Sequence, residues 1–585
     1  MLLLSIDSCL LFFITFFTGV AAEKCLNKFL KVCLVTHFLE TFFLGLLTTC
    51  IYFNLVSFFV PVNYLVLLPL LLPVVLVLKK KTERQLFFYR TRQTVFFFFS
   101  KKNLPFTVSS GLLLFFYWII PPQIWDSGSY HYITIRWYEQ FKIIPGLANI
   151  HGRFAFNPAN FIISAAYSFT NIVHQSLYPL NGVLSLLFYC WLYKKALEQA
   201  GSIYSFILFI LGILLFRIVL AAISSPSADL LSGLLIFYCG FRTYELIKAG
   251  RNALDDYLPV LILCCFSVLA KLTALPSLLI LPFIYFAIIK INKNRFTLIK
   301  LVFIAGLIFI PWLARNFLLS GYFLFPVPGT NIFHPDWSVP DSVAQLEYLF
   351  AKYGPRGNQT YNDYIALQKM NPLDLTITWF KYSFSVSRMQ AMIFSASALS
   401  LPVWGLVYLL TGKIKRRPFL LWGIYYLCIY AWLISSPEFR FGLSYMLLAL
   451  AIPCFELIKG LPKRSKTYYP ALFTIFCCAI PVYYAMIVIE NRNKNGLSLQ
   501  HCWIKPTRDI RYSYNNDLST FPFMSLGHDV KLYLPDKTHE CLNADGPCML
   551  YRYGQIELRG DKITDGFRNV KDEVKTYFPY LDKSR

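Results

Sequence analysis

The residue types best suited to chemistry lie in one polar stretch, residues 125–154, which contains Asp126, His131, His151 and Arg153 among aromatic side chains. This stretch follows directly on an apolar run at residues 106–120. A carboxylate kept at the end of a membrane helix is costly and usually has a function. We therefore predict that Asp126 is catalytic and acts as a general base, the group that removes a proton from an attacking hydroxyl.

Other uncommon polar residues stand beside apolar runs elsewhere in the chain. Asp229 precedes the run 230–246, Arg315 follows the run 301–313, and Arg440 precedes the run 441–458. Arginine and lysine are suited to hold a phosphate group, because their donors form charge-assisted hydrogen bonds. We predict a substrate-binding group that comprises His131, His151, Arg153, Asp229, Arg315 and Arg440, with Lys271 as a further cation.

Each of these residues also has a simpler interpretation. Asp126 could cap a helix or orient its neighbours, and Asp229 could be a helix N-cap, a frequent role for aspartate. Arg315 could be an interface anchor, and Glu438 and Arg440 could pair with each other. The sequence leaves these alternatives open.

The composition predicts a polytopic membrane protein. The 585 residues are 56% hydrophobic and only 15% charged, whereas a soluble chain has about 25% charged residues. Repeated apolar runs of membrane-spanning length give about fourteen predicted spans, to within about two. The expected fold class is all-α, a helical bundle with long extracytoplasmic loops.

The basic residues determine the predicted orientation. They form short clusters between the apolar runs, such as 79–81 and 415–417, although the net charge is +24. Such clusters mark cytoplasmic loops, so we expect membrane lipid as a partner and no nucleic acid. The same assignment places Asp126, Asp229, Arg315 and Arg440 together on the extracytoplasmic side.

Three regions are predicted. Residues 1–104 form N-terminal spans and a basic cytoplasmic interfacial segment, residues 105–490 form the membrane core, and residues 491–585 form an extracytoplasmic C-terminal segment. The polar loop 318–392 is too long for a simple connection and should have structure of its own. In the C-terminal segment, the alternation at 530–534 predicts a strand. Cys541 and Cys548 could form a disulfide there, with Cys502 as a competing partner.

The placement of Asp126 after the run 106–120 resembles the first outer loop of the GT-C superfamily, integral membrane glycosyltransferases that use polyprenyl-phosphate sugars. Several short motifs more closely resemble a group of bacterial GT-C-like multi-pass membrane proteins: 126–131 (DSGSYH), 145–149 (PGLAN), 224–227 (SSPS) before Asp229, and 558–560 and 565–567 in the C-terminal segment. The resemblance implies a GT-C-like bundle in a bacterial inner (cytoplasmic) membrane. It also implies transfer of a sugar from a polyprenyl-phosphate donor to an extracytoplasmic glycan or lipid-linked acceptor.

The sequence departs from this family in one respect. Many GT-C enzymes carry paired acidic residues in the first outer loop, often with a divalent metal, whereas the acidic residue nearest to Asp126 is Glu139. The missing second carboxylate weakens the case for a metal: a divalent metal is possible as a cofactor, but no metal ligands are predicted. Two other functions stay open: a polysaccharide polymerase, and a lipid-linked oligosaccharide transporter. The concentration of polar residues on one face disfavours transport, which needs them at mid-depth.

Overall fold

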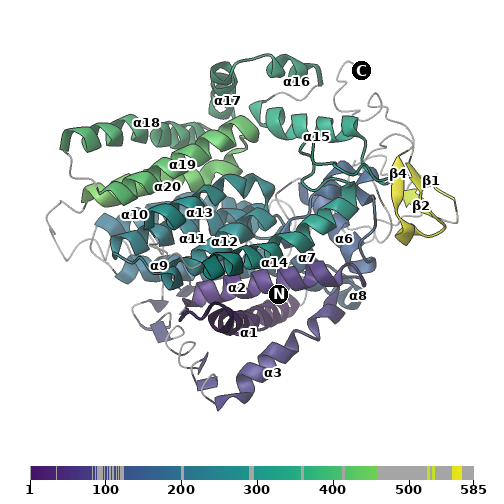
Figure 1. The fold of residues 1–585 in the computed structure, drawn as a ribbon, viewed down its shortest axis with the longest axis horizontal. Coiled ribbons are helices and arrows are strands. Elements are labelled where there is room, and N and C mark those ends of the chain that lie inside the picture. The colour runs from purple at the N-terminus through teal and green to yellow at the C-terminus, as the bar shows by residue number, and fades with distance from the viewer. Residues whose placement is uncertain are drawn as a thin grey trace.

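The computed structural model is predominantly helical. It describes residues 2–34, 36–81, 126–198, 203–288, 295–357, 361–411, 415–458, 523–527, 530–533 and 556–569, with single residues and short groups elsewhere. Figure 1 shows a bundle of helices, with the short strands of the C-terminal segment at one edge.

The helices of the first half are α1 (Leu2–Leu30), α2 (Phe38–Val56), α3 (Leu71–Lys79), α6 (Tyr132–Gln140), α7 (Ala159–Ala166), α8 (Thr170–Val173), α9 (Leu180–Glu198), α10 (Ile203–Ala222), α11 (Asp229–Lys248) and α12 (Leu254–Ala270). Those of the second half are α13 (Ile280–Phe283), α14 (Arg295–Ser320), α15 (Asp341–Tyr353), α16 (Tyr361–Gln368), α17 (Pro372–Val386), α18 (Arg388–Thr411), α19 (Arg416–Ser435) and α20 (Phe439–Ile458).

Seven helices in the described part of the chain are long and apolar enough to cross a membrane: α1, α2, α11, α14, α18, α19 and α20. The prediction of an all-α membrane protein is thus confirmed at this level. Several other predicted spans form shorter helices. The apolar run 60–78, for example, is divided into a 3₁₀ turn (Tyr64–Leu67) and the nine-residue α3, with Pro69 between the two elements. The predicted span 469–489 lies almost entirely outside the described residues.

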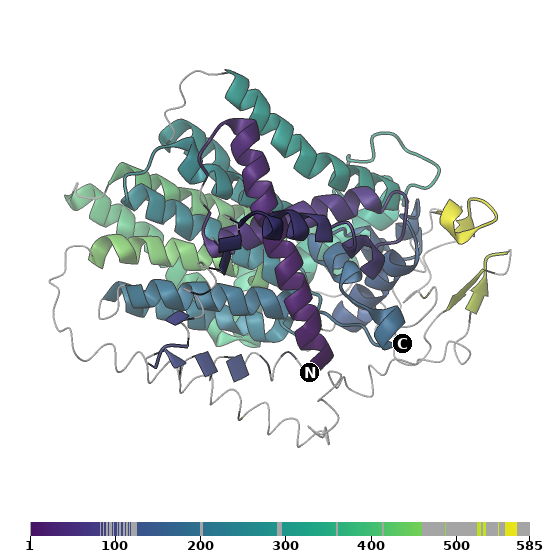
Figure 2. The ribbon, with the colours of Figure 1, turned by 90° about the horizontal axis from the view of Figure 1, so that it is seen from below.

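The N-terminal helices pack closely on each other and on the rest of the bundle. Gly19 of α1 and Gly45 of α2 face each other, and a Cβ on either glycine would overlap the backbone of the other helix. Small residues allow such close approach of membrane helices, and Figure 2 shows α1 crossing α2. On its other sides α2 packs against α7, α12 and α14.

Helix α11 lies in the middle of the bundle, where it packs against α12, α19 and α20. Its first residue, Asp229, and Arg242 in its second half are both charged and lie about 20 Å apart along the helix. At the Arg242 end, the guanidinium Nε lies 3.4 Å from Glu40 Oε1 of α2, and Lys195 of α9 pairs with Glu245 at 3.1 Å. The bundle therefore has a charged cluster at each end, and Asp229 belongs to the other one.

The long loop 318–392 contains α15, α16 and α17, as its length suggested. The C-terminal segment contains two antiparallel strand pairs: β1 (Phe523–Ser525) with β2 (Lys531–Tyr533), and β3 (Ile556–Leu558) with β4 (Phe567–Asn569). The predicted strand at 530–534 is thus confirmed by β2. Cys548 is disulfide-bonded, while Cys502 and Cys541 lie outside the described residues.

Candidate functional site

Asp126 is held by two arginines from distant parts of the chain. It stands just before the π-helical turn Ser127–His131, which continues into α6. Its Oδ1 accepts a hydrogen bond from Arg153 Nη1 at 3.2 Å, and its Oδ2 accepts one from Arg440 Nη2 at 3.1 Å. Asp126 occupies the N-cap position of this turn, but its side chain forms no capping hydrogen bond and is used by the two arginines instead.

Asp229 supplies a second carboxylate to the same cluster. Its Oδ2 lies 3.1 Å from Arg440 Nη1, and its Oδ1 accepts a hydrogen bond from Lys271, which follows the end of α12. The N-cap of α11 is Ala228, with Asp229 as the first helical residue. Asp229 therefore acts through these ion pairs and is not the N-cap.

The Ser-Ser-Pro-Ser turn before α11 fixes the position of Asp229. Asn181 of α9 donates to the backbone carbonyls of Ser225 and Ser227, at 2.7 and 2.9 Å. The hydroxyl of Ser225 also lies 2.7 Å from that of Ser127, beside Asp126. Because buried amides and hydroxyls lock this turn, the two carboxylates are held at a fixed separation by rigid elements.

Arg440 is positioned by the loop that precedes α20. Trp379 and Trp432 donate their indole N–H groups to the carbonyls of Pro437 and Glu438, at 2.6 and 2.9 Å. Arg440 Nε lies 3.7 Å from Glu438 Oε1, so the predicted Glu438–Arg440 pair exists beside the contacts with the two aspartates. Arg440 is thus shared by three carboxylates.

Arg153 lies between two aromatic rings, with its guanidinium carbon 5.2 Å from the centroid of Tyr130 and 4.8 Å from that of Phe350. Its Nε is also 3.9 Å from Oε2 of Glu347, a buried residue of α15. The sequence prediction missed Glu347. The sequence did contain one sign of its role: Glu347 is a charged residue one turn after Val343, on the apolar face of the amphipathic helix α15.

Burial and the neighbouring charges of the cluster shift the pKa values of Asp126 and His131. Burial raises the pKa of Asp126, but Arg153 and Arg440 lower it by more, so its net pKa lies below the ordinary value. Burial lowers the pKa of His131 to about 4. Asp126 is therefore ionised and His131 neutral at neutral pH, which leaves the imidazole able to accept or donate a hydrogen bond without adding charge.

His131 packs against the site through ring contacts with Tyr130 and Phe161, at centroid distances of 4.5 and 5.0 Å. His151 has a different place, because its Nδ1 accepts a hydrogen bond from the backbone N–H of Arg153 at 3.1 Å. It shapes the 3₁₀ turn Gly152–Ala155 that carries Arg153. We therefore assign His151 to the positioning of Arg153, whereas the prediction placed it in contact with substrate.

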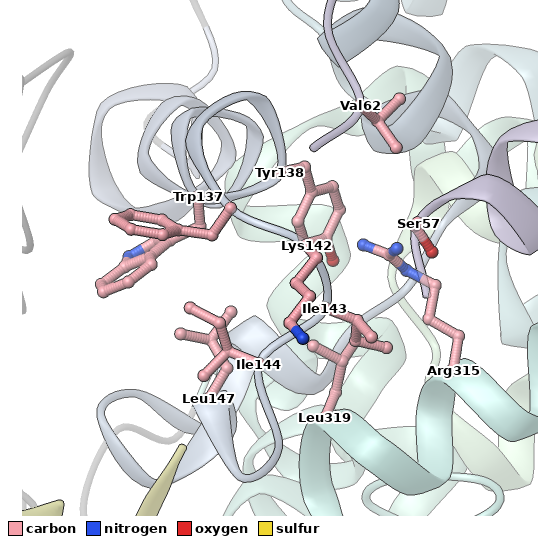
Figure 3. A pocket seen from close by; sticks show the side chains of 11 residues that line it. Ser57, Val62, Trp137, Tyr138, Lys142, Ile143, Ile144, Leu147, Arg315 and Leu319 are labelled. Carbon is pink, nitrogen blue, oxygen red and sulfur yellow. The ribbon is translucent and has the colours of Figure 1, made fainter. Parts of the chain in front are cut away.

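Arg315 lies in a separate pocket, shown in Figure 3. Its Nε donates to Asn157 Oδ1 at 3.0 Å, and its guanidinium carbon lies 4.0 Å from the centroid of Tyr138. Within the described residues, the side-chain contacts of Arg315 do not include a member of the Asp126 cluster. The structure thus brings together Asp126, Arg153, Asp229, Arg440 and Lys271, with His131 beside them, and leaves Arg315 outside.

The acidic residues of the site are not arranged as metal ligands. The described residues contain no group of three or more His, Cys, Asp or Glu side chains that could hold a metal ion. The oxygens of Asp126 and Asp229 face arginine and lysine donors, whose positive charge would repel a divalent cation. Glu139, the nearest acidic residue in the sequence, is buried and paired with Arg136.

Comparison with known proteins gives one match. The family described as "Domain of unknown function (DUF8201)" matches residues 1–447, which include α1, α2 and the whole Asp126 cluster. No curated protein and no solved structure matches the chain. The chain therefore belongs to the DUF8201 family.

Proposed function

We propose that this chain is an integral membrane glycosyltransferase, which moves a sugar from a polyprenyl-phosphate donor to an extracytoplasmic glycan or lipid-linked acceptor. One observation supports this proposal above the others. A carboxylate suited to proton removal, Asp126, shares the cation Arg440 with a second carboxylate, Asp229, which is itself paired with Lys271. A donor phosphate and an acceptor hydroxyl need this combination of groups.

Arg440 is the natural ligand of the donor phosphate. Arginine binds phosphate through two parallel N–H donors, and the two terminal nitrogens of Arg440 are the atoms that now contact Asp126 and Asp229. A phosphate that takes these donors removes one of the charges that lowers the pKa of Asp126. Donor binding would thus turn a neutralised carboxylate into a stronger base, at the moment when a base is needed.

The proposed reaction has a simple balance. The acceptor hydroxyl forms a bond to the sugar carbon that carries the phosphate, while the bond from that carbon to the phosphate oxygen breaks. The hydroxyl proton passes to Asp126, and polyprenyl phosphate leaves with the bonding electrons. Arg440 and Lys271 stabilise the negative charge of the departing phosphate.

The position of the cluster favours a lipid-linked substrate and an extracytoplasmic site. Asp229 and Arg440 lie at the first turns of α11 and α20, two helices that can cross a membrane. The basic residues Lys195 and Arg242 lie at the other end of the bundle, which the positive-inside rule assigns to the cytoplasm. The disulfide-bonded Cys548 fits an oxidising compartment for the C-terminal segment. We propose a bacterial inner membrane as the location of the protein.

The proposal is tested with the purified full chain in liposomes that contain short-chain polyprenyl-phosphate sugars and a crude lipid-linked glycan acceptor. Transfer of labelled sugar, with release of polyprenyl phosphate, is the expected result. Elongation of the acceptor by many sugars would assign a polymerase, and movement of intact labelled donor across the bilayer would assign a transporter. Either result, without single-sugar transfer, would contradict the proposal.

A further inference from the structure

Arg315 carries a buried positive charge without a carboxylate partner in the described part of the chain. Its side chain is only 1% exposed. Its contacts there are the amide of Asn157 and the ring of Tyr138, and its Nη2 forms no hydrogen bond to a described residue. A buried cation of this kind is expensive to maintain unless an anion accompanies it.

The unpartnered donor belongs to a pocket. Arg315, Tyr138 and Lys142 line it together with Ser57, Trp137 and several apolar side chains, and it has room for little more than one water-sized group. The hydroxyl of Tyr138 is also buried without a hydrogen-bond partner among the described residues. The pocket thus offers two unused hydrogen-bond donors and the exposed ammonium of Lys142, which together suit an oxyanion.

The pocket lies near the ends of α14 and α2, two helices long and apolar enough to cross a membrane. Arg315 is five residues before the end of α14, or about 7 Å along the helix axis. Ser57 directly follows α2, whose first turn carries Glu40 at the Arg242 end of the bundle. The pocket is therefore at the same end of the bundle as Asp126.

Apolar surface adjoins the pocket on one side. The segment that contributes Ser57 and Val62 to the lining also carries Phe59 and Val60, which are exposed, and Leu65 follows them with its side chain exposed as well. Exposed phenylalanine and leucine beside a buried arginine are what the acyl chain and the phosphate of one lipid would contact. A freely soluble anion would leave this apolar surface unused.

We propose that the Arg315 pocket binds the phosphate of an anionic membrane lipid. Arg315 and Tyr138 bind a phosphate oxygen, Lys142 contributes charge at the mouth, and the acyl chains lie along Phe59 and Leu65. The narrow pocket admits one oxygen of the phosphate, while the other oxygens and the rest of the headgroup stay outside. This site is separate from the Asp126 cluster and does not depend on the proposed transfer reaction.

The test uses the detergent-purified full chain and thermal unfolding. Short-chain phosphatidylglycerol should raise the unfolding temperature more than short-chain phosphatidylcholine, and Arg315→Gln should weaken the phosphatidylglycerol response by at least about tenfold in concentration, as expected for loss of a charge-assisted hydrogen bond. Arg388→Gln is the matched control, because Arg388 is exposed at the start of α18, and it should respond like the wild type.

Lys142→Gln provides a second variant that should fold normally, because Lys142 is exposed, and it should weaken the response by a smaller factor. An equal response of the wild type, Arg315→Gln and Lys142→Gln would overturn the site. The same shift with inorganic phosphate alone would overturn the lipid as its ligand. Absence of any difference between the two lipids in the wild type would overturn the proposal as a whole.

Discussion

Asp126 and Asp229 share the guanidinium of one arginine, Arg440, whose two terminal nitrogens each lie 3.1 Å from one of the carboxylates. The sequence around Asp126 has no second acidic residue next to it. Asp229, the first residue of α11, provides a second carboxylate in the folded chain. The two carboxylates are kept apart by a cation. This arrangement favours the binding of a phosphate that competes for the cation over the binding of a metal by the carboxylates.

Asp126→Asn should reduce sugar transfer by at least about a hundredfold, the lower range for loss of a general base, without lowering the amount of protein in the membrane. The amide keeps the size of the side chain but cannot take the proton. Asp256→Asn is the control, because Asp256 lies in the first turn of α12, at the opposite end of that helix from Lys271. Full transfer by Asp126→Asn would refute the role of Asp126 as the base.

Arg440→Gln should lower both stability and donor binding. The variant leaves Asp126 and Asp229 close together with one cation fewer, which we expect to cost about 2 kcal/mol of unfolding free energy. The KM for the donor should rise more than kcat falls. Arg417→Gln is a matched control, since Arg417 is half-buried and is hydrogen-bonded to Asn252 at 2.7 Å, away from the Asp126 cluster. An unchanged donor KM in Arg440→Gln would show that the phosphate binds elsewhere.

Stability should fall as the pH is lowered from about 6.5 to about 4, partly because of His131. Burial lowers its pKa from the ordinary 6.5 to about 4, so in this window the unfolded chain binds a proton that the folded chain does not. The unfolded state is then favoured, by about 3 kcal/mol at most for this residue.

His131→Gln should remove the part of the pH-dependent loss of stability that comes from His131. The part that comes from His151, whose pKa is also lowered by burial, should stay. The measurement is thermal unfolding of both proteins across the pH window. His334→Asn is the control, because His334 is exposed at a positive φ of 43°, which asparagine tolerates. Parallel curves for the wild type and His131→Gln would argue against a buried neutral His131.

Sequence position alone predicted most of the charged cluster. Asp126, Asp229 and Arg440 each stand at the end of an apolar run, where a charged residue is conspicuous and where the side of the membrane follows from the basic flanks. The same reasoning grouped Arg315 with them, because a single apolar run does not show which neighbour its polar residue faces. Packing of α14 turns Arg315 towards Tyr138.

Contacts made by tertiary structure were beyond sequence reasoning. Glu347 reaches Arg153 only because α15 folds back from the long loop. His151 looked like a ligand because histidine often is one, yet its Nδ1 is used by the backbone of Arg153. The division of the apolar run 60–78 shows that hydrophobicity identifies apolar segments better than it identifies continuous helices.

Gly152→Ala should loosen α15 from the site. A Cβ on Gly152 would lie 3.1 Å from both Cγ and Oε1 of Glu347, so the glutamate must move away from Arg153. We expect a loss of about 1 kcal/mol, the lower range for overpacking, with faster proteolysis within residues 341–357. Gly405→Ala in α18 has open space around it and should be neutral or slightly stabilising. Equal proteolysis of the two variants would mean that Gly152 does not control α15.

Gly566→Ala should detach the C-terminal segment from the loop that follows α6. Phe567 N–H donates to the carbonyl of Pro145 at 3.0 Å, and a Cβ on Gly566, whose φ is 100°, would overlap that carbonyl oxygen. Gly527→Ala separates this clash from backbone strain, because Gly527 has a φ of 87° but nothing near its Cβ position. Both variants carry the strain of a positive φ, and only Gly566→Ala adds the clash. Limited proteolysis should therefore release the C-terminal segment faster in Gly566→Ala, and equal release in the two variants would show that the contact with Pro145 does not hold the segment in place.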